Sequence, residues 1–350
     1  MKILITGGAG FIGSHLVESL LNLGHNIIVV DNFDDFYDIN VKCRNVLDSL
    51  SKKHDLNKII KEADKEVKIN LLIDATESKN YKLYYEDIRN NEKMDEIFYR
   101  ENPEMIINLA ALAGVGPSLE RALEYESVNV HGMMILLELC KKYKIIKFIQ
   151  ASSSSVYGNN EKVPFKETDI VDKPISPYAA TKKSGEIIGY QYHYLCNINM
   201  ILLRFFTVYG ERQRPDLAIH KFTKLIFEDK EIPFYGTGES SRDYTYIGDI
   251  IDGIISSVNY LNNNENVYEI FNLGNFRTIN LRNMVEIIEK NIGKKAKIKY
   301  LDSKPGDVNI TFADIKKARE ILEYNPKIAF ETGIKKFIKW YYKNSDIYKI

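Results

Sequence analysis

A tyrosine and a lysine four residues apart form the most chemically suggestive pair in this chain of 350 residues. Tyr178 and Lys182 follow Pro177 at the expected start of a helix, and their spacing places both side chains on one face. A phenol with an ordinary pKa near ~10 is a poor base at neutral pH, but a nearby ammonium favours the phenolate and lowers that pKa. The pair therefore predicts a general base, although the same spacing also occurs in ordinary helix pairs.

Serines gather at the end of the strand that precedes this helix. The expected strand Ile146–Gln150 is followed by Ala151, by serines at 152–155 and by Val156-Tyr157-Gly158. A serine hydroxyl in this place can share a substrate oxygen with the tyrosine and relay its proton. The alternative interpretation is a serine-rich turn without catalytic meaning.

The first thirty-one residues predict a nucleotide-binding unit. Strand, glycine turn, helix, strand and acid follow one another as Lys2–Thr6, Gly7–Gly13, Ser14–Leu23, Ile27–Val30 and Asp31. Glycines let the backbone bend tightly and approach a pyrophosphate without Cβ atoms in the way. The helix that follows offers phosphates its N-terminal N–H groups and the positive end of its dipole.

Asp31 indicates which dinucleotide would bind. A carboxylate at the end of the second strand accepts hydrogen bonds from the adenosine ribose and repels a 2′-phosphate, so it favours NAD over NADP. The nicotinamide would supply the redox chemistry, and its positive ring would further favour the Tyr178 phenolate. A glycine turn that binds nothing is the alternative, and the flanking strands and the acid argue against it.

Alternating strand and helix patterns fill roughly residues 1–200 and predict a parallel, doubly wound α/β sheet with helices on both faces. Ligands of such sheets bind outside the carboxyl ends of the strands, where the glycine turn and the serines lie. Small residues, Ala110 and Ala111, follow the expected strand Met105–Leu109 and suit a backbone that passes close to a cofactor. The other elements expected here are the strand Tyr81–Tyr85 and the helices Glu92–Glu101 and Leu123–Tyr143.

Two further regions complete the expected organisation. The lysine-rich stretch from Val41 to about Asn80 is interpreted as a helix-containing surface insertion with solvated charges. Beyond Arg204 the mixed pattern predicts a smaller α/β lobe that closes over the substrate. Its expected helices lie near Leu217–Glu228, Ile247–Leu261, Leu281–Ile292 and Ala313–Leu322, and its loops at Gly236–Gly238 and Pro305–Asp307. We expect a nucleotide-binding domain at 1–203 with a contribution from about 243–275, and a substrate-binding lobe at 204–242 and 276–350.

Composition excludes several classes of function. Apolar residues make up 45% of the chain, which supports a full core and argues against disorder. Lys+Arg and Asp+Glu are equal at 48 each, so nothing points to nucleic acid or an anionic membrane as partner.

The cysteines are odd in number and lack metal-ligand spacing. We therefore expect Cys43, Cys140 and Cys196 to be reduced thiols, with no metal site and a cytoplasmic location. No apolar run is long enough to span a membrane, and Met1 leads directly into a strand, so no signal peptide is expected.

Together these motifs resemble the extended short-chain dehydrogenase/reductase family, in its nucleotide-sugar epimerase branch. The motifs are Thr6–Gly13, Asp87-Ile88, the serine run, Tyr178-x-x-x-Lys182, Arg204–Gly210 and Arg242-Asp243-Tyr244. The resemblance covers nearly the whole chain, except roughly Lys42–Asn80. It implies a tightly held NAD, a UDP-sugar substrate and a homodimer built on two long helices per subunit.

The resemblance also implies roles for individual residues. Tyr178 is the base, Lys182 its partner on the nicotinamide ribose, and Ser153 the relay hydroxyl. Cofactor-contacting positions are Gly7, Gly10, Phe11, Ile12, Gly13, Asp31, Asn32, Asp87, Ile88, Leu109, Ala110, Ala111, Asn129, Tyr178, Lys182 and Phe206. Substrate-binding positions are Ser153, Ser154, Ser155, Tyr178, Thr207, Arg214, Arg242 on the diphosphate and Asp307 near the uridine ribose.

The serine run favours epimerisation within this branch. The related 4,6-dehydratases and UDP-glucuronate decarboxylases carry an acid just before the Val-Tyr-Gly, and elimination needs that acid to protonate the leaving hydroxyl. Ser154 and Ser155 occupy those positions, and neither is a strong acid. We therefore expect oxidation to a 4-keto sugar, which swings round its phosphate linkage and takes the hydride back on its other face.

The choice of sugar depends on Thr207 and Arg214. Galactose epimerases have Asn at the position of Thr207, whereas Thr207 with Arg214-Pro215-Asp216 is similar to UDP-glucuronate 4-epimerases. A hydroxyl and a guanidinium make a sound carboxylate site. Gly116 departs from that group, in which arginine is usual, so UDP-glucose and UDP-N-acetylglucosamine remain as alternative substrates. The alternative interpretation of Arg214 is a surface or interface arginine.

Two other classes of function remain as alternatives. A net redox enzyme, such as a nucleotide-sugar reductase, would need exchangeable NADPH, which Asp31 disfavours. A non-catalytic dinucleotide sensor on the same fold can dispense with the tyrosine–lysine pair, which is present here.

Overall fold

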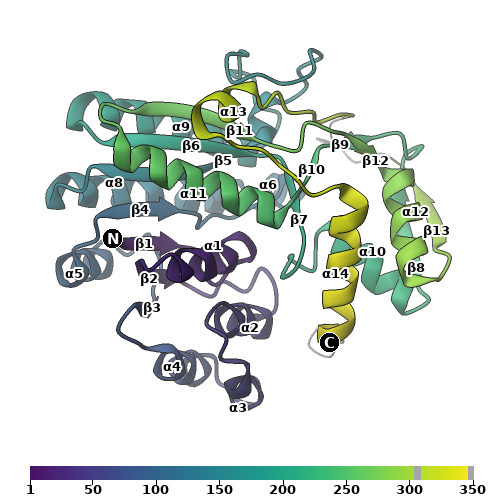
Figure 1. The fold of residues 1–350 in the computed structure, drawn as a ribbon, viewed down its shortest axis with the longest axis horizontal. Coiled ribbons are helices and arrows are strands. Elements are labelled where there is room, and N and C mark those ends of the chain that lie inside the picture. Colours follow the sequence, from purple (N-terminus) through teal and green to yellow (C-terminus); the bar gives the residue numbers. More distant parts are fainter. Residues whose placement is uncertain (303–308, 346–350) are drawn as a thin grey trace. The chain divides into compact units, whose positions relative to one another are not determined.

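The computed structural model describes residues 1–302 and 309–345 (Figure 1). The chain forms two compact units. Residues 1–152, 176–203 and 254–270 make the first, and residues 153–175, 204–253 and 271–350 make the second. The sequence-based division, 1–203 with about 243–275 against 204–242 and 276–350, follows binding roles rather than compactness and stays a prediction.

A seven-stranded sheet forms the centre of the first unit, in the order β11-β6-β5-β4-β1-β2-β3. The strands are β1 (Lys2–Thr6), β2 (Asn26–Asp31), β3 (Tyr81–Tyr85), β4 (Met105–Asn108), β5 (Lys147–Ser153), β6 (Asn199–Phe205) and β11 (Tyr268–Leu273). Pairing is parallel between β1 and β2, β1 and β4, β2 and β3, and β4 and β5. Since the strand order reverses beside β1, a ligand crevice is expected at its carboxyl end. The predicted parallel, doubly wound α/β sheet is confirmed.

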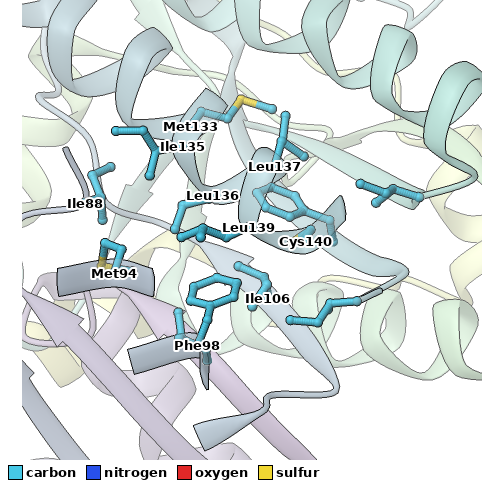
Figure 2. Close-up of a cluster of buried hydrophobic side chains, with 14 of the residues drawn as sticks. Ile88, Met94, Phe98, Ile106, Met133, Ile135, Leu136, Leu137, Leu139 and Cys140 are labelled. Atoms are coloured by element: carbon cyan, nitrogen blue, oxygen red, sulfur yellow. The ribbon is translucent and has the colours of Figure 1, made fainter. Parts of the chain in front are cut away.

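Helices of the first unit cover this sheet with apolar side chains. The longer ones are α1 (Phe11–Asn22), α2 (Ile39–Ser49), α4 (Lys65–Thr76), α5 (Asn91–Glu101), α8 (Gly132–Tyr143) and α9 (Pro177–Cys196), and α11 spans Ile247–Asn263. Strand side chains alternate between faces, so Leu4 and its register partner Ile28 point to one side. There they join a buried cluster in which Figure 2 shows Phe98 of α5 and Leu136 of α8 beside Ile106 of β4.

The stretch between β2 and β3 differs from its expected form. It is helical as expected, with α2, a 3₁₀ turn (Lys53–Asp55), α3 (Leu56–Ile60) and α4. The expectation of solvated charges is wrong for Lys42, Arg44 and Lys68, which are all buried. Each has a partner: the Lys42 ammonium lies over the Tyr37 ring at 5.1 Å, Arg44 pairs with Asp48 at 3.5 Å, and Lys68 donates to the Asn40 side chain at 2.8 Å.

The expected long helix at Leu123–Tyr143 is interrupted. It consists of α7 (Ala122–Glu126), a π-helical turn (Ser127–His131) and α8, preceded by α6 (Val115–Glu120). A π turn inserts one residue into the helical ladder and turns the side chains around it, and such turns frequently occur at functional sites. Asn129 lies in the middle of this one.

The second unit combines short strand pairs with helices. Its pairs are β7 (Thr207–Tyr209) with β10 (Tyr244–Tyr246), β8 (Glu231–Tyr235) with β13 (Lys297–Leu301), and β9 (Ser241–Arg242) with β12 (Ile279–Asn280). Its helices are α10 (Ala218–Phe227), α12 (Leu281–Ile292), α13 (Lys316–Leu322) and α14 (Phe330–Asn344), with a 3₁₀ turn at Ser154–Tyr157. The predicted helices are present, α14 was not predicted, and the loop expected at Pro305–Asp307 lies outside the described residues.

Three further expectations concern cysteines, membranes and metals. Cys43 and Cys140 are buried free thiols, and burial raises the pKa of the Cys43 thiol to about 12. Within residues 1–302 and 309–345, no helix has both the length and the apolar character of a membrane span. The same described residues contain no cluster of His, Cys, Asp and Glu side chains suited to a metal ion.

Candidate active site

The glycine turn after β1 leaves no room for larger residues. Gly7 has a φ of 72°, and a Cβ at this position would lie 2.8 Å from the backbone nitrogen of Ala110. A Cβ at Gly13 would collide with the carbonyl oxygen of Gly7. Helix α1 begins at Phe11, and its N-cap Gly10 provides no side-chain cap and is followed by no acid in the first turn. Neither a side-chain cap nor an acid of the first turn takes up the N–H groups at this helix end, which fits the pyrophosphate of a dinucleotide.

Asp31 at the end of β2 is tied to the same turn. Its carboxylate is 7% exposed, and its Oδ2 accepts a hydrogen bond from the Ala9 N–H at 3.0 Å. The Phe33 N–H donates to Oδ1 at 2.9 Å. A carboxylate offers about four lone-pair sites, so both oxygens keep capacity for the hydroxyls of a ribose. Asp31 thus fixes the shape of the turn, and its contact with the ribose stays a prediction from sequence.

Asn32 and Asp87 meet across the ends of β2 and β3. The Asn32 amide donates to Asp87 Oδ2 at 2.9 Å, and the Arg89 guanidinium donates to both Asp87 oxygens at 2.8 and 2.7 Å. Burial raises the pKa of Asp87, but hydrogen bonds from Arg89 and Asn32 outweigh it and lower that pKa to about 2. The Ile88 side chain is buried in the hydrophobic cluster of Figure 2, so its backbone is the part left for a ligand.

The predicted residues after β4 are held close to the glycine turn. The N–H groups of Leu109 and Ala110 donate to the carbonyl and hydroxyl oxygens of Thr6 at 3.2 and 3.1 Å. Leu109, Ala110 and Ala111 are half-buried, as is Ile12 at the start of α1, whereas Phe11 is buried.

Asn129 uses its side chain to join two elements. Its Oδ1 accepts from the Leu112 N–H at 2.9 Å, and its Nδ2 donates to the Leu112 carbonyl and to the Thr181 hydroxyl, both at 3.0 Å. Thr181 lies in α9 between Tyr178 and Lys182. The geometry therefore assigns Asn129 a positioning task in addition to the cofactor contact that the sequence predicts.

Helix α9 brings Tyr178 and Lys182 together. Ser176 caps the helix by accepting a hydrogen bond from the Ala179 N–H at 3.2 Å. The Lys182 ammonium nitrogen is 5.8 Å from the centre of the Tyr178 ring and donates to the Ala151 carbonyl oxygen at 3.0 Å. Burial lowers the pKa of Lys182 to about 8, because the charged form loses its hydration.

A buried acid on the same helix was missed from sequence. Glu186 is 1% exposed and accepts hydrogen bonds from the Ser152 hydroxyl at 2.8 Å and from the Lys183 ammonium at 3.2 Å. It follows Lys182 by four residues, as Lys182 follows Tyr178. This repeated spacing on one helical face is the signal that was available.

Ser153 ends β5 and caps the 3₁₀ turn Ser154–Tyr157 of the second unit. Its Oγ accepts hydrogen bonds from the Ser155 N–H at 3.1 Å and from the Ser155 hydroxyl at 3.0 Å. Both bonds use Ser153 as acceptor, which leaves its own O–H for donation to another oxygen. Ser154 and Ser155 form the first two residues of the 3₁₀ turn.

This turn is anchored by a buried polar network that sequence reasoning also missed. Arg204 is 1% exposed and donates to the Tyr157 hydroxyl at 2.9 Å, which in turn donates to the Asn272 side chain at 2.7 Å. Phe206 is buried, with its ring 6.3 Å from that of Tyr157. The Phe206 side chain thus packs in the core of the second unit.

The remaining predicted substrate residues lie on separate elements of the second unit. Thr207 begins β7 and is half-buried. The Arg214 guanidinium holds both oxygens of Asp216, at 3.0 and 2.6 Å. Arg242 in β9 donates to the carbonyl oxygens of Ser241 and Asn309 at 3.0 and 3.3 Å. The predicted Asp307 lies outside the described residues.

Comparison with known sequences places the chain in a family. Residues 4–64 and 44–337 match the family described as GDP-mannose 4,6 dehydratase, and the chain belongs to it. The predicted membership of the extended short-chain dehydrogenase/reductases, in the branch of the nucleotide-sugar epimerases, is thereby confirmed.

Three relatives illustrate this similarity. A UDP-glucuronate 4-epimerase of Thermodesulfobacterium geofontis is 40% identical, over 99% of this chain and 98% of its own length. A crystal structure of UDP-glucuronic acid 4-epimerase from Bacillus cereus, in complex with UDP-glucuronic acid and NAD, is 33% identical with a TM-score of 0.85, covering 98% of this chain and 100% of its own. The structure of a UDP-glucose 4-epimerase with UDP-glucose from Thermotoga maritima is 30% identical with a TM-score of 0.82, over 99% and 100% of the two chains.

Proposed function

We propose that this protein is an NAD-dependent 4-epimerase that interconverts UDP-glucuronate and UDP-galacturonate. The observation that carries the proposal is the buried Lys182 ammonium beside the Tyr178 ring, in a unit whose glycine turn fits a pyrophosphate. The full-length similarity to UDP-glucuronate 4-epimerases supports it, as does the NAD in the Bacillus cereus structure.

The proposed chemistry divides between the cofactor and the chain. NAD, when bound, supplies hydride transfer to and from C4 of the sugar. The glycine turn, the N-terminus of α1 and Asp31 would hold it. Tyr178 would take the proton of the 4-hydroxyl and return it, with Lys182 favouring the phenolate and Ser153 relaying the proton. Oxidation and reduction cancel, so the net change is inversion at C4.

Arg214 and Thr207 are the residues proposed to bind the C6 carboxylate. The ion pair with Asp216 fixes the guanidinium, and a fixed guanidinium binds a carboxylate with less loss of entropy than a mobile one. The Arg242 guanidinium would bind the diphosphate through two parallel hydrogen bonds. The serine-rich turn offers hydroxyls and no carboxylate at 154 and 155, which favours epimerisation over elimination.

A UDP-glucose or UDP-N-acetylglucosamine 4-epimerase is the second candidate. It is favoured by Gly116, where arginine is usual among UDP-glucuronate 4-epimerases, and by the similarity to the Thermotoga maritima enzyme. The two candidates are separated by incubating the purified protein with each UDP-sugar and following the products by proton NMR. We expect UDP-galacturonate from UDP-glucuronate. Conversion of the neutral sugars alone would reject the uronate proposal.

We also propose a homodimer that uses the outer face of α9. Ile187, Tyr190, Tyr194 and Leu195 are exposed there at helical spacing, which is unusual for large apolar side chains. Sedimentation analysis should give a dimer for the wild type and a monomer when Ile187 and Tyr194 are both replaced by Glu. A wild-type monomer would refute this.

A further inference from the structure

Helix α2 keeps several polar side chains away from solvent. Asn45 is completely buried, and Arg44, Asp48 and Ser49 are nearly so. Helix α2 lies between β2 and β3, and none of its own residues has been assigned a cofactor or substrate role. What these buried groups contact therefore decides whether α2 is only a structural insertion.

Asn45 reaches from α2 to the glycine turn. Its side-chain Nδ2 donates a hydrogen bond to the carbonyl oxygen of Ala9 at 3.1 Å. The N–H of the same Ala9 donates to Asp31 Oδ2 at 3.0 Å. The side chains of Asn45 in α2 and Asp31 in β2 thus hold the carbonyl and the N–H of Ala9, which lies between Gly8 and Gly10.

Stability alone does not explain an asparagine at this position. The Oδ1 of Asn45 is buried and accepts no hydrogen bond from any described residue. Burial of an unpaired amide oxygen costs more free energy than one neutral hydrogen bond returns, so an apolar side chain of similar size would serve the packing of α2 better. The one hydrogen bond that the Asn45 side chain makes to the described residues goes to the turn, which indicates the reason for this residue.

We propose that Asn45 is a positioning residue for the nucleotide-binding turn, whose amide fixes the Ala9 carbonyl and so preorganises the turn and the start of α1 for the pyrophosphate of NAD. A glycine-rich turn loses much conformational freedom when it is ordered. A side chain that orders it beforehand lowers the entropic cost of binding. The inference rests on NAD binding and not on the identity of the sugar.

The test compares Asn45→Ala and Asn45→Asp with a matched control, Ser49→Ala. Ser49 is a buried polar residue of the same helix, and its hydroxyl donates to the Val46 carbonyl at 2.7 Å, away from the turn. NAD affinity is measured by calorimetric titration of nucleotide-free protein, and thermal stability is measured on the same samples. We expect Asn45→Ala to weaken NAD binding about fivefold to tenfold, the effect of losing one ordinary hydrogen bond. Asn45→Asp should weaken it further, because its oxygen faces the Ala9 carbonyl, whereas Ser49→Ala should leave the affinity unchanged.

An Asn45→Ala protein that binds NAD within twofold of the wild type overturns the proposal, as does an equal loss of affinity in Ser49→Ala. If Asn45→Asp does not fold, Asn45→Ala decides alone, since it removes atoms and adds no charge. A wild type that binds NAD without converting any UDP-sugar would refute the proposed function and leave this test intact.

Discussion

The Lys182 ammonium nitrogen lies 5.8 Å from the centre of the Tyr178 ring and uses one of its three N–H groups to donate a hydrogen bond to the carbonyl oxygen of Ala151. Helix α9 fixes this relation, because residues four apart in a helix are neighbours on its surface. The other two N–H donors have no acceptor among the described residues, so they can serve a ligand. The positive charge is held where it favours a phenolate over a phenol.

Removal of the Tyr178 hydroxyl should abolish most of the turnover. In Tyr178→Phe the ring still fills its place against Tyr125, but no group remains to take the proton. We expect kcat to fall by about 10²–10⁴, with unchanged NAD content. Turnover is measured by NMR, and NAD is measured after denaturation. Tyr99→Phe, at an exposed position of α5 away from the proposed dimer face, is the control and should keep wild-type turnover. Undiminished turnover in Tyr178→Phe would refute the assignment of the base.

Burial of Lys182 should make the nucleotide-free protein more stable as the pH rises. The folded pKa of about 8 lies below the ordinary 10.5, so the unfolded chain binds more protons between these values and stability rises with pH there. The full effect is about 3 kcal/mol. Lys182→Met removes this titration and should therefore show a flatter pH dependence of unfolding between pH 8 and 10. Parallel curves for the two proteins would show that Lys182 is not the group responsible.

Local patterns predicted much of the fold and the tight glycine turn after β1. The strands Lys2–Thr6 and Tyr81–Tyr85 have the predicted bounds, and so does the helix Leu281–Ile292, which starts after the cap Asn280. These elements depend on periodicity and capping, which neighbouring residues determine. The glycine turn was predictable for the same reason, since its spacing encodes a backbone shape.

Features that depend on contacts distant in sequence were not predictable. The buried Lys68 ammonium donates a hydrogen bond to the Asn40 side-chain oxygen, and no local pattern shows that pairing. The π turn at Ser127–His131 shifts the helical ladder by one residue without a compositional signature. Asn45 lies 36 residues from the Ala9 carbonyl that it holds. The contact of Asn45 with the glycine turn forms only when α2 packs against α1.

Arg214 should control the preference for an acidic sugar. A hydrogen bond between charged groups contributes about 1.5–3 kcal/mol, so Arg214→Gln should lower kcat/KM for UDP-glucuronate by about tenfold to a hundredfold. The value for UDP-glucose should stay the same or rise, because its C6 hydroxyl gains little from a guanidinium. Arg282→Gln, which removes an exposed guanidinium from α12, is the control and should change neither value. An equal loss for both sugars in Arg214→Gln would contradict carboxylate recognition and indicate a structural role for the ion pair with Asp216.

Acid should destabilise the second unit through His220. Its ring is buried against Phe337 and Tyr341 of α14, and burial lowers the pKa of His220 to about 4. The unfolded chain, with an ordinary value of 6.5, therefore binds more protons between pH 6.5 and 4, and stability falls as the pH falls through this range. The loss approaches about 3 kcal/mol when both states are protonated. In His220→Leu the titration is absent, so the difference in melting temperature between wild type and variant should shift in favour of the variant from pH 7 to pH 4.5. A constant difference across that range would mean that His220 stays neutral in both states or is charged in both.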